Sequence, residues 1–63
     1  GDAKLSKTDI LRLFDQEEIL EERAQKGLQE LGYSGSDTTA LLGPVRKRID
    51  RRREREQAEM DRD

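Results

Sequence analysis

Residues 44–63 read PVRKRIDRRREREQAEMDRD, and this stretch organises the rest of the chain. Pro44 suits the first position of a helix and disfavours helical geometry at the residue before it, so we expect a helix over residues 44–62. At about 100° per residue, Val45 and Ile49 lie on one side of that helix. The positions that continue their line are mostly polar, so only the first turns of the helix have an apolar face that can pack.

Basic side chains crowd one side of this helix. Measured around the axis from Val45, they lie at about 200–300°, and the set is Lys47, Arg48, Arg51, Arg55 and Arg62. A narrower acidic stripe lies at about 140–180° and comprises Asp50, Glu54 and Asp61. Like charges four residues apart repel each other in an isolated helix. The one-sided clustering predicts an acidic partner, and the alternative is a solvated helix face.

The composition leaves little material for a core. The 63 residues are 30% hydrophobic and 44% charged, with a net charge of −2. A chain of this size buries only about 60% of the surface that its unfolded form exposes. Without cysteine or histidine, disulfides are excluded and a structural zinc site is not expected. We therefore expect a single small helical domain, residues 1–63, that gains stability from self-association or from a partner.

The charge is also unevenly distributed along the chain. Residues 1–35 carry eight acids and five bases, residues 45–55 carry seven bases and two acids, and residues 56–63 carry four acids and one base. This acidic, basic, acidic order suits antiparallel or head-to-tail pairing of two copies as well as it suits an external anion.

The residue types argue against catalysis. The chain has neither the commonest general base, histidine, nor the thiol nucleophile. Its paired glutamates fall on solvated helix faces, with no apolar pocket around them. We therefore expect that the chain is not an enzyme and that it uses no cofactor, no metal and no small-molecule substrate.

No apolar run is long enough for a membrane span and no signal peptide is evident, so a cytoplasmic or nuclear location is expected. The start at Gly1 suggests a processed piece of a longer chain.

Two capping patterns predict two short helices before the charged one. Ser6 is the expected N-cap of a helix over residues 6–14, with Asp9 at its third position and Leu5 packed onto Ile10. The same pattern recurs with Asp15 as the expected N-cap of a helix over residues 15–31. We therefore expect a break at Asp15. The alternative is one unbroken helix, because apolar residues from Ile10 to Leu31 also fit a near-heptad line.

Gly32 and Tyr33 predict the end of the second helix. Glycine suits the left-handed position after a helix, and Tyr33 can close back onto Leu28. Gly27, inside the helix, is explained by the close approach of a neighbouring helix. A linker over residues 32–37 and a brief helical turn over 38–42, capped by Ser36 or Asp37, then lead to the boundary at Gly43 and Pro44.

These elements define an all-α fold. Two short capped helices precede a long charged C-terminal helix, in a helical hairpin or three-helix arrangement that self-associates. Apolar residues are predicted either to hold the last helix on the first two or to contact a second chain, and the set is Leu11, Phe14, Leu20, Leu28, Leu41, Leu42, Val45 and Ile49. We predict a non-catalytic protein-interaction or oligomerisation module. Leu20→Asp should abolish both association and helicity.

The alternative function is binding of RNA or DNA through the arginine-rich segment 45–55. Arginine is suited to bidentate contacts with phosphate and guanine. The candidate contact residues are Lys47, Arg48, Arg51, Arg52 and Arg55. No aromatic residue is interleaved with them for base stacking. This reading predicts an affinity that falls steeply as salt rises.

Overall fold

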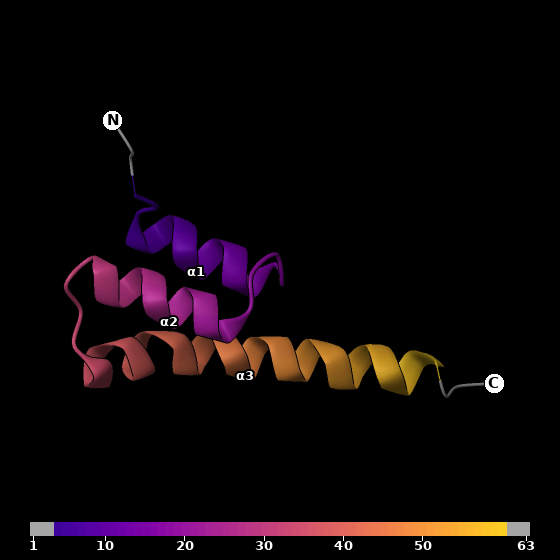
Figure 1. Ribbon diagram of the computed structural model, residues 1–63. Helices are drawn as coiled ribbons and strands as arrows, with labels where there is room; N and C mark the ends of the chain where they lie inside the picture. The colour runs from indigo at the N-terminus through magenta and orange to yellow at the C-terminus, as the bar shows by residue number, and fades with distance from the viewer. Residues whose placement is uncertain (1–3, 61–63) are drawn as a thin grey trace.

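A computed structural model describes residues 4–60 as three helices that all contact one another. They are α1 (Lys7–Asp15), α2 (Glu21–Glu30) and α3 (Gly35–Met60). Figure 1 shows α1 and α2 on one side of α3, whose C-terminal part continues beyond them. The all-α, three-helix prediction is confirmed. The predicted last residues of the charged helix, 61 and 62, lie outside the described part of the chain.

The start of α1 agrees with the capping pattern. The Ser6 hydroxyl accepts a hydrogen bond of 3.1 Å from the backbone N–H of Asp9. Leu5 is partly buried against the core that contains Ile10. The side-chain cap satisfies one of the N–H groups that a helix start leaves without a partner.

The chain breaks at Asp15 as expected, but Asp15 is the last residue of α1 and not the N-cap of α2. The unbroken-helix alternative is wrong. So is the boundary at residue 15, because α2 begins only at Glu21 with Leu20 at its N-cap position. The intervening residues leave helical geometry at Glu17, which has a left-handed φ of 60°. Glu17 is the sole non-glycine residue with positive φ in the described chain.

Glu17 allows α1 to end in a Schellman motif. The backbone N–H of Glu17 donates to the carbonyl of Phe14 at 2.9 Å, and that of Glu18 donates to Leu13 at 2.9 Å. These two bonds reverse the chain direction and carry it away from α1. Glutamate gives no sequence signal for this geometry, which glycine and asparagine favour, so the pattern at Asp15 was misleading.

The end of α2 agrees with the prediction in detail. Gly32 is left-handed, with φ of 102°. Its N–H donates to Gln29 at 2.9 Å, and the N–H of Tyr33 donates to Leu28 at 3.1 Å, which again is the Schellman pair. A Cβ at Gly27 would lie 2.9 Å from Cδ1 of Ile10, so the close approach of α1 explains that glycine.

The third helix is longer than predicted. Ser34, rather than Ser36 or Asp37, caps it by accepting a hydrogen bond of 3.1 Å from the N–H of Asp37. The helix then runs through Pro44 without a break, so the predicted turn 38–42 and the boundary at Gly43 are wrong.

Two features make a helix through Pro44 tolerable. The steric penalty before a proline falls partly on the preceding Cβ, and Gly43 has none. Pro44 itself is exposed, so the carbonyl that loses its N–H partner, that of Ala40, is on a hydrated side. Leu42 and Val45, on either side of the proline, are both buried, and their packing holds the segment in one helix.

The core lies where α1 and α2 meet the first half of α3. Its buried apolar residues are Ile10, Phe14, Ala24, Leu28, Leu42, Val45 and Ile49. The packing of α3 on the first two helices through this apolar segment matches the expectation from sequence. Beyond Arg52, which is half-buried, every described residue of α3 is exposed. We call residues 53–60 the arm.

Candidate functional site

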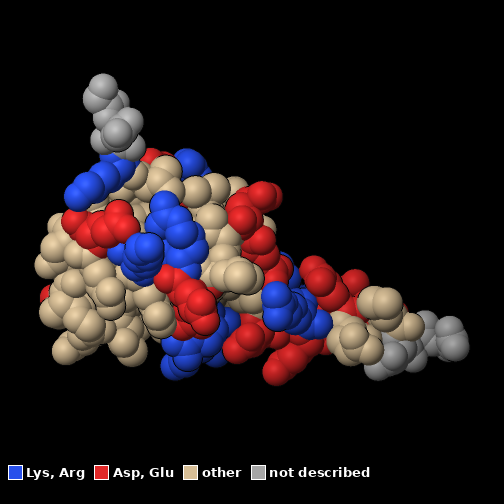
Figure 2. All heavy atoms as spheres, in the orientation of Figure 1, with Lys and Arg blue, Asp and Glu red and all other residues tan. Residues whose placement is uncertain are grey.

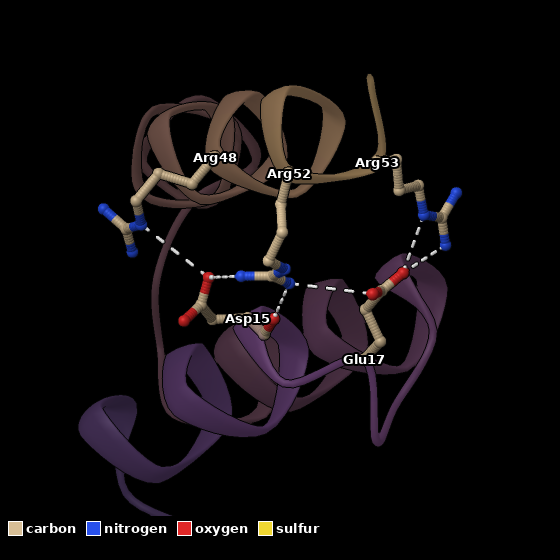
Figure 3. Close-up of polar contacts among 5 residues, drawn as sticks. All are labelled: Asp15, Glu17, Arg48, Arg52 and Arg53. Carbon is tan, nitrogen blue, oxygen red and sulfur yellow. Dashed lines mark hydrogen bonds and ion pairs between the residues drawn. The ribbon is translucent and has the colours of Figure 1, made fainter. Parts of the chain in front are cut away.

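The arginines of α3 make different contacts depending on the side of the helix from which they project. Figure 3 shows Arg52 between Asp15, the last residue of α1, and Glu17 of the α1–α2 connection, with Arg48 and Arg53 flanking it. The Nη1 atom of Arg52 is 3.5 Å from Oδ1 of Asp15, and its Nη2 is 3.6 Å from Oε2 of Glu17. Arg52 therefore links Asp15, at the end of α1, to Glu17 in the α1–α2 connection.

Arg52 also completes the hydrogen bonding at the end of α1. Its Nη2 donates to the backbone carbonyl of Asp15 at 2.5 Å. The two preceding carbonyls already accept the Schellman hydrogen bonds. A cation at the carboxyl end of a helix also interacts favourably with the helix dipole. Arg52 is therefore a tertiary C-cap supplied from 37 residues away.

Three further ion pairs surround this contact. Nε of Arg48 is 3.7 Å from Oδ1 of Asp15, and Arg53 donates to Oε1 of Glu17 through Nε at 2.8 Å and also through Nη2. Nη2 of Arg46 is 2.8 Å from Oε2 of Glu21 at the start of α2. Side chains as exposed as these contribute about 0–1 kcal/mol per pair. Together they fix the α1–α2 connection against α3.

Four arginines of α3 surround a shallow hollow. The hollow has a volume of about 310 Å³, and its lining residues are Arg48, Arg51, Arg52 and Arg55. We call these four residues the arginine patch. Their spacing of three and four residues places them on one helix face. Arg48 and Arg52 reach Asp15, whereas Arg51 and Arg55 make no ion pair within residues 4–60.

The patch therefore includes four of the five predicted nucleic-acid-binding residues. The fifth, Lys47, is exposed but does not line the hollow. Sequence reasoning did not identify Asp15 as the acid that orients half of the patch. No sequence signal could have done so, because that contact depends on the left-handed turn at Glu17 and the register of α3.

A second hollow, also of about 310 Å³, lies between the α1–α2 connection and α3. Its apolar lining is Phe14, Ile19, Leu20 and Ile49, and its charged lining is Glu17, Glu21, Arg46, Asp50 and Arg53. We call it the Leu20 groove. Leu20 is 79% exposed, the highest value among the large hydrophobic side chains of the described chain.

The predicted protein-interface residues separate into three groups by burial. Five are buried inside the single chain and are therefore part of its own core, namely Phe14, Leu28, Leu42, Val45 and Ile49. For Phe14 and Leu28 this corrects the expectation that they are exposed for a second chain. Leu11 and Leu41 are partly buried against the core, and Leu20 is exposed.

Charge of both signs covers much of the remaining surface. Figure 2 shows basic and acidic side chains interleaved on the face in view and along the arm.

Within residues 4–60 no group of three or more acidic, histidine or cysteine side chains could hold a metal ion. No helix in this range is long and apolar enough to cross a membrane. Comparison of the chain with known protein families, curated proteins and solved structures finds no match.

Proposed function

We propose that this chain is a non-catalytic helical interaction module that self-associates through the Leu20 groove. The observation that carries this proposal is the residue at the N-cap of α2. Leu20 occupies that position with no side-chain cap hydrogen bond, and its side chain is 79% exposed. Serine, threonine, aspartate and asparagine are preferred at an N-cap, and replacing them with an apolar residue costs about 1 kcal/mol.

Leucine is thus unfavourable at this position in the single chain for two independent reasons. It leaves an N–H group at the start of α2 without a side-chain cap, and it exposes a large apolar side chain to water. Positions that violate a local rule without a local gain are commonly functional. Burial of Leu20 against another chain would recover about 1.5–3 kcal/mol per side chain.

A second copy of the chain is the partner that the groove suits best. Its apolar floor, formed by Phe14, Ile19 and Ile49, lies directly beside Leu20. Its rim carries both signs of charge, with Glu21 paired to Arg46 and Glu17 paired to Arg53. A two-fold contact brings the same surface from each chain together, so a rim of mixed sign is self-complementary. Each Leu20 would then enter the groove of the other chain.

Sedimentation equilibrium over a range of concentrations tests this proposal. We expect the unmodified chain to dimerise and Leu20→Asp to be monomeric. Met60→Asp is the matched control, because Met60 is 77% exposed but lies at the end of the arm, away from the groove. It should associate like the unmodified chain. A chain that stays monomeric at every concentration, or equal loss of association in both variants, would refute the proposal.

Circular dichroism separates association from folding in the same experiment. Sequence alone predicted that Leu20→Asp would also abolish helicity, but the exposed position of Leu20 leads to a different expectation. Aspartate at the N-cap can accept a hydrogen bond from a backbone N–H at the start of α2, and its negative charge interacts favourably with the helix dipole. We therefore expect Leu20→Asp to keep its helicity and to stabilise the monomer by about 1 kcal/mol.

A further inference from the structure

We propose that the arginine patch binds the phosphodiester backbone of a nucleic acid. The patch is lined by four guanidinium side chains, and no acidic side chain lines the hollow between them. This inference does not depend on self-association, because the patch and the Leu20 groove share no lining residue.

The patch holds a local excess of positive charge. Two acids contact it, since Oδ1 of Asp15 lies 3.5 Å from Arg52 and 3.7 Å from Arg48, and Oε2 of Glu17 lies 3.6 Å from Arg52, which leaves two more cations than acids. Arg51 and Arg55 have no ion-pair partner within residues 4–60. Four cations at spacings of three and four residues repel one another along a helix. An external anion would relieve this repulsion, and phosphate oxygens match the planar fork of the guanidinium group.

Asp15 also prepares the patch for such an anion. It orients the side chains of Arg48 and Arg52, so these two lose less conformational freedom when an anion binds. Arg51 and Arg55 are exposed and have no ion pair within residues 4–60, so they can close on a phosphate from the solvent side. The arrangement thus combines two oriented donors with two adaptable ones on one face of α3.

The lining chemistry favours a nucleic acid over an acidic protein or a small phosphorylated molecule. Protein interfaces centre on buried apolar or aromatic anchors, and the hollow is lined by arginines alone. Small-molecule sites are enclosed and lined mainly by hydrophobic and aromatic side chains, whereas this hollow is open and lined by arginines. A polyanion needs neither feature. With Lys47 included, the cations extend over about 12 Å of helix, enough to meet about three successive phosphates of one strand.

Fluorescence anisotropy with a labelled mixed-sequence DNA duplex of 20 base pairs tests the proposal. We expect binding at 50 mM salt that weakens as salt rises, with a log–log slope of about −0.9 for each phosphate contacted. The test variant is Arg51→Gln/Arg55→Gln, because these two arginines make no contact with Asp15 and their loss should leave the fold intact. We expect at least a tenfold loss of affinity at 50 mM salt and a slope smaller by about 2.

Lys7→Gln/Lys26→Gln is the matched control. It removes the same charge from two exposed residues of α1 and α2, and its affinity should stay within about twofold of the unmodified chain. Equal weakening in both double variants would attribute binding to net charge and overturn the proposal. Absence of binding at 50 mM salt would also overturn it. Displacement of the duplex by polyglutamate or pyrophosphate as effectively as by unlabelled duplex would instead assign the patch to an acidic polypeptide or a small phosphate ligand.

Discussion

The two connections between the helices use the same backbone motif but stabilise it differently. Both α1 and α2 end in the Schellman pair of hydrogen bonds, with a left-handed residue after the C-cap. After α2 that residue is Gly32, for which left-handed geometry carries no Cβ penalty. After α1 it is Glu17, for which the geometry costs about 1–2 kcal/mol.

The difference shows what each connection depends on. The stop at Gly32 needs only residues of its own segment, and a Cβ there would meet nothing within 4 Å. The stop at Glu17 is supported by α3, because Arg52 binds Asp15 and Glu17, and Arg53 binds Glu17. The first connection should therefore form only together with α3, whereas the second is specified locally.

Removing the C-cap that Arg52 supplies to α1 should cause the largest loss of stability among these variants. Arg52→Ala leaves the Asp15 carbonyl without its donor and removes two ion pairs, so we expect a loss of about 2–3 kcal/mol of unfolding free energy. Urea denaturation followed by circular dichroism measures it. Arg53→Ala is the control, since Arg53 contacts only an exposed carboxylate, and it should cost less than about 1 kcal/mol. Equal losses would mean that the carbonyl contact is unimportant.

Gly32→Ala should break the locally specified connection. Alanine is forced into a left-handed conformation there without any clash, so the expected loss is about 1–2 kcal/mol from backbone strain alone. Gly35→Ala, at the first residue of α3, likewise adds a Cβ that meets nothing, but its φ is not positive. It should change stability by less than about 0.5 kcal/mol in the same urea titration. A neutral Gly32→Ala would contradict the assigned geometry.

The segment after the second connection contains a buried polar group that a substitution can remove. Thr38 is 2% exposed, and its hydroxyl has no hydrogen-bond partner among residues 4–60. Thr38→Val keeps the shape and removes the unsatisfied oxygen, so we expect a gain of about 1 kcal/mol. Thr39→Val is the control, because the exposed Thr39 hydroxyl donates to the carbonyl of Gly35. Thermal unfolding should show a higher midpoint for the first variant alone.

Glu17→Gly should change the free energy of unfolding least of these variants at low salt. Its stability relative to the unmodified chain should depend on salt concentration. Glycine removes the left-handed strain but also the ion pairs with Arg52 and Arg53, so near-cancellation within about 1 kcal/mol is expected at low salt. At about 1 M salt the exposed pairs are screened and the variant should become more stable than the unmodified chain. Glu17→Gln loses the charge but keeps the strain, and it should be less stable at low salt. A salt-independent difference for Glu17→Gly would argue against the proposed balance.

Part of the fold was predictable because the relevant interactions are local. The Ser6 cap, the Gly32 stop and the apolar spacing around Val45 and Ile49 each involve residues within a few positions of one another. The start of α2 was not predictable, since Asp15 fits the pattern of an N-cap and the sequence Gln16-Glu17-Glu18 contains no residue that favours a left-handed turn.

The candidate sites also have features that were predictable from the sequence and features that were not. The clustering of arginines on one helix face follows from helical periodicity, and the sequence predicted four of the residues that now line one hollow. Which arginines are paired could not be predicted, because it depends on where the α1–α2 turn meets α3. Phe14 and Leu28, predicted to contact a second chain, are instead core residues, since burial within one chain and burial between two chains produce the same apolar pattern.

The sequence by itself determined the helical class, the cap at Ser6, the stop at Gly32 and the basic face of the last helix. Each of these follows from backbone preferences and hydrogen bonds within one or two helical turns. The tertiary structure alone decided the left-handed turn at Glu17, the continuous helix through Pro44 and the exposure of Leu20. These features depend on burial against other helices and on contacts between residues 36 and 37 positions apart in the chain, which no local preference specifies.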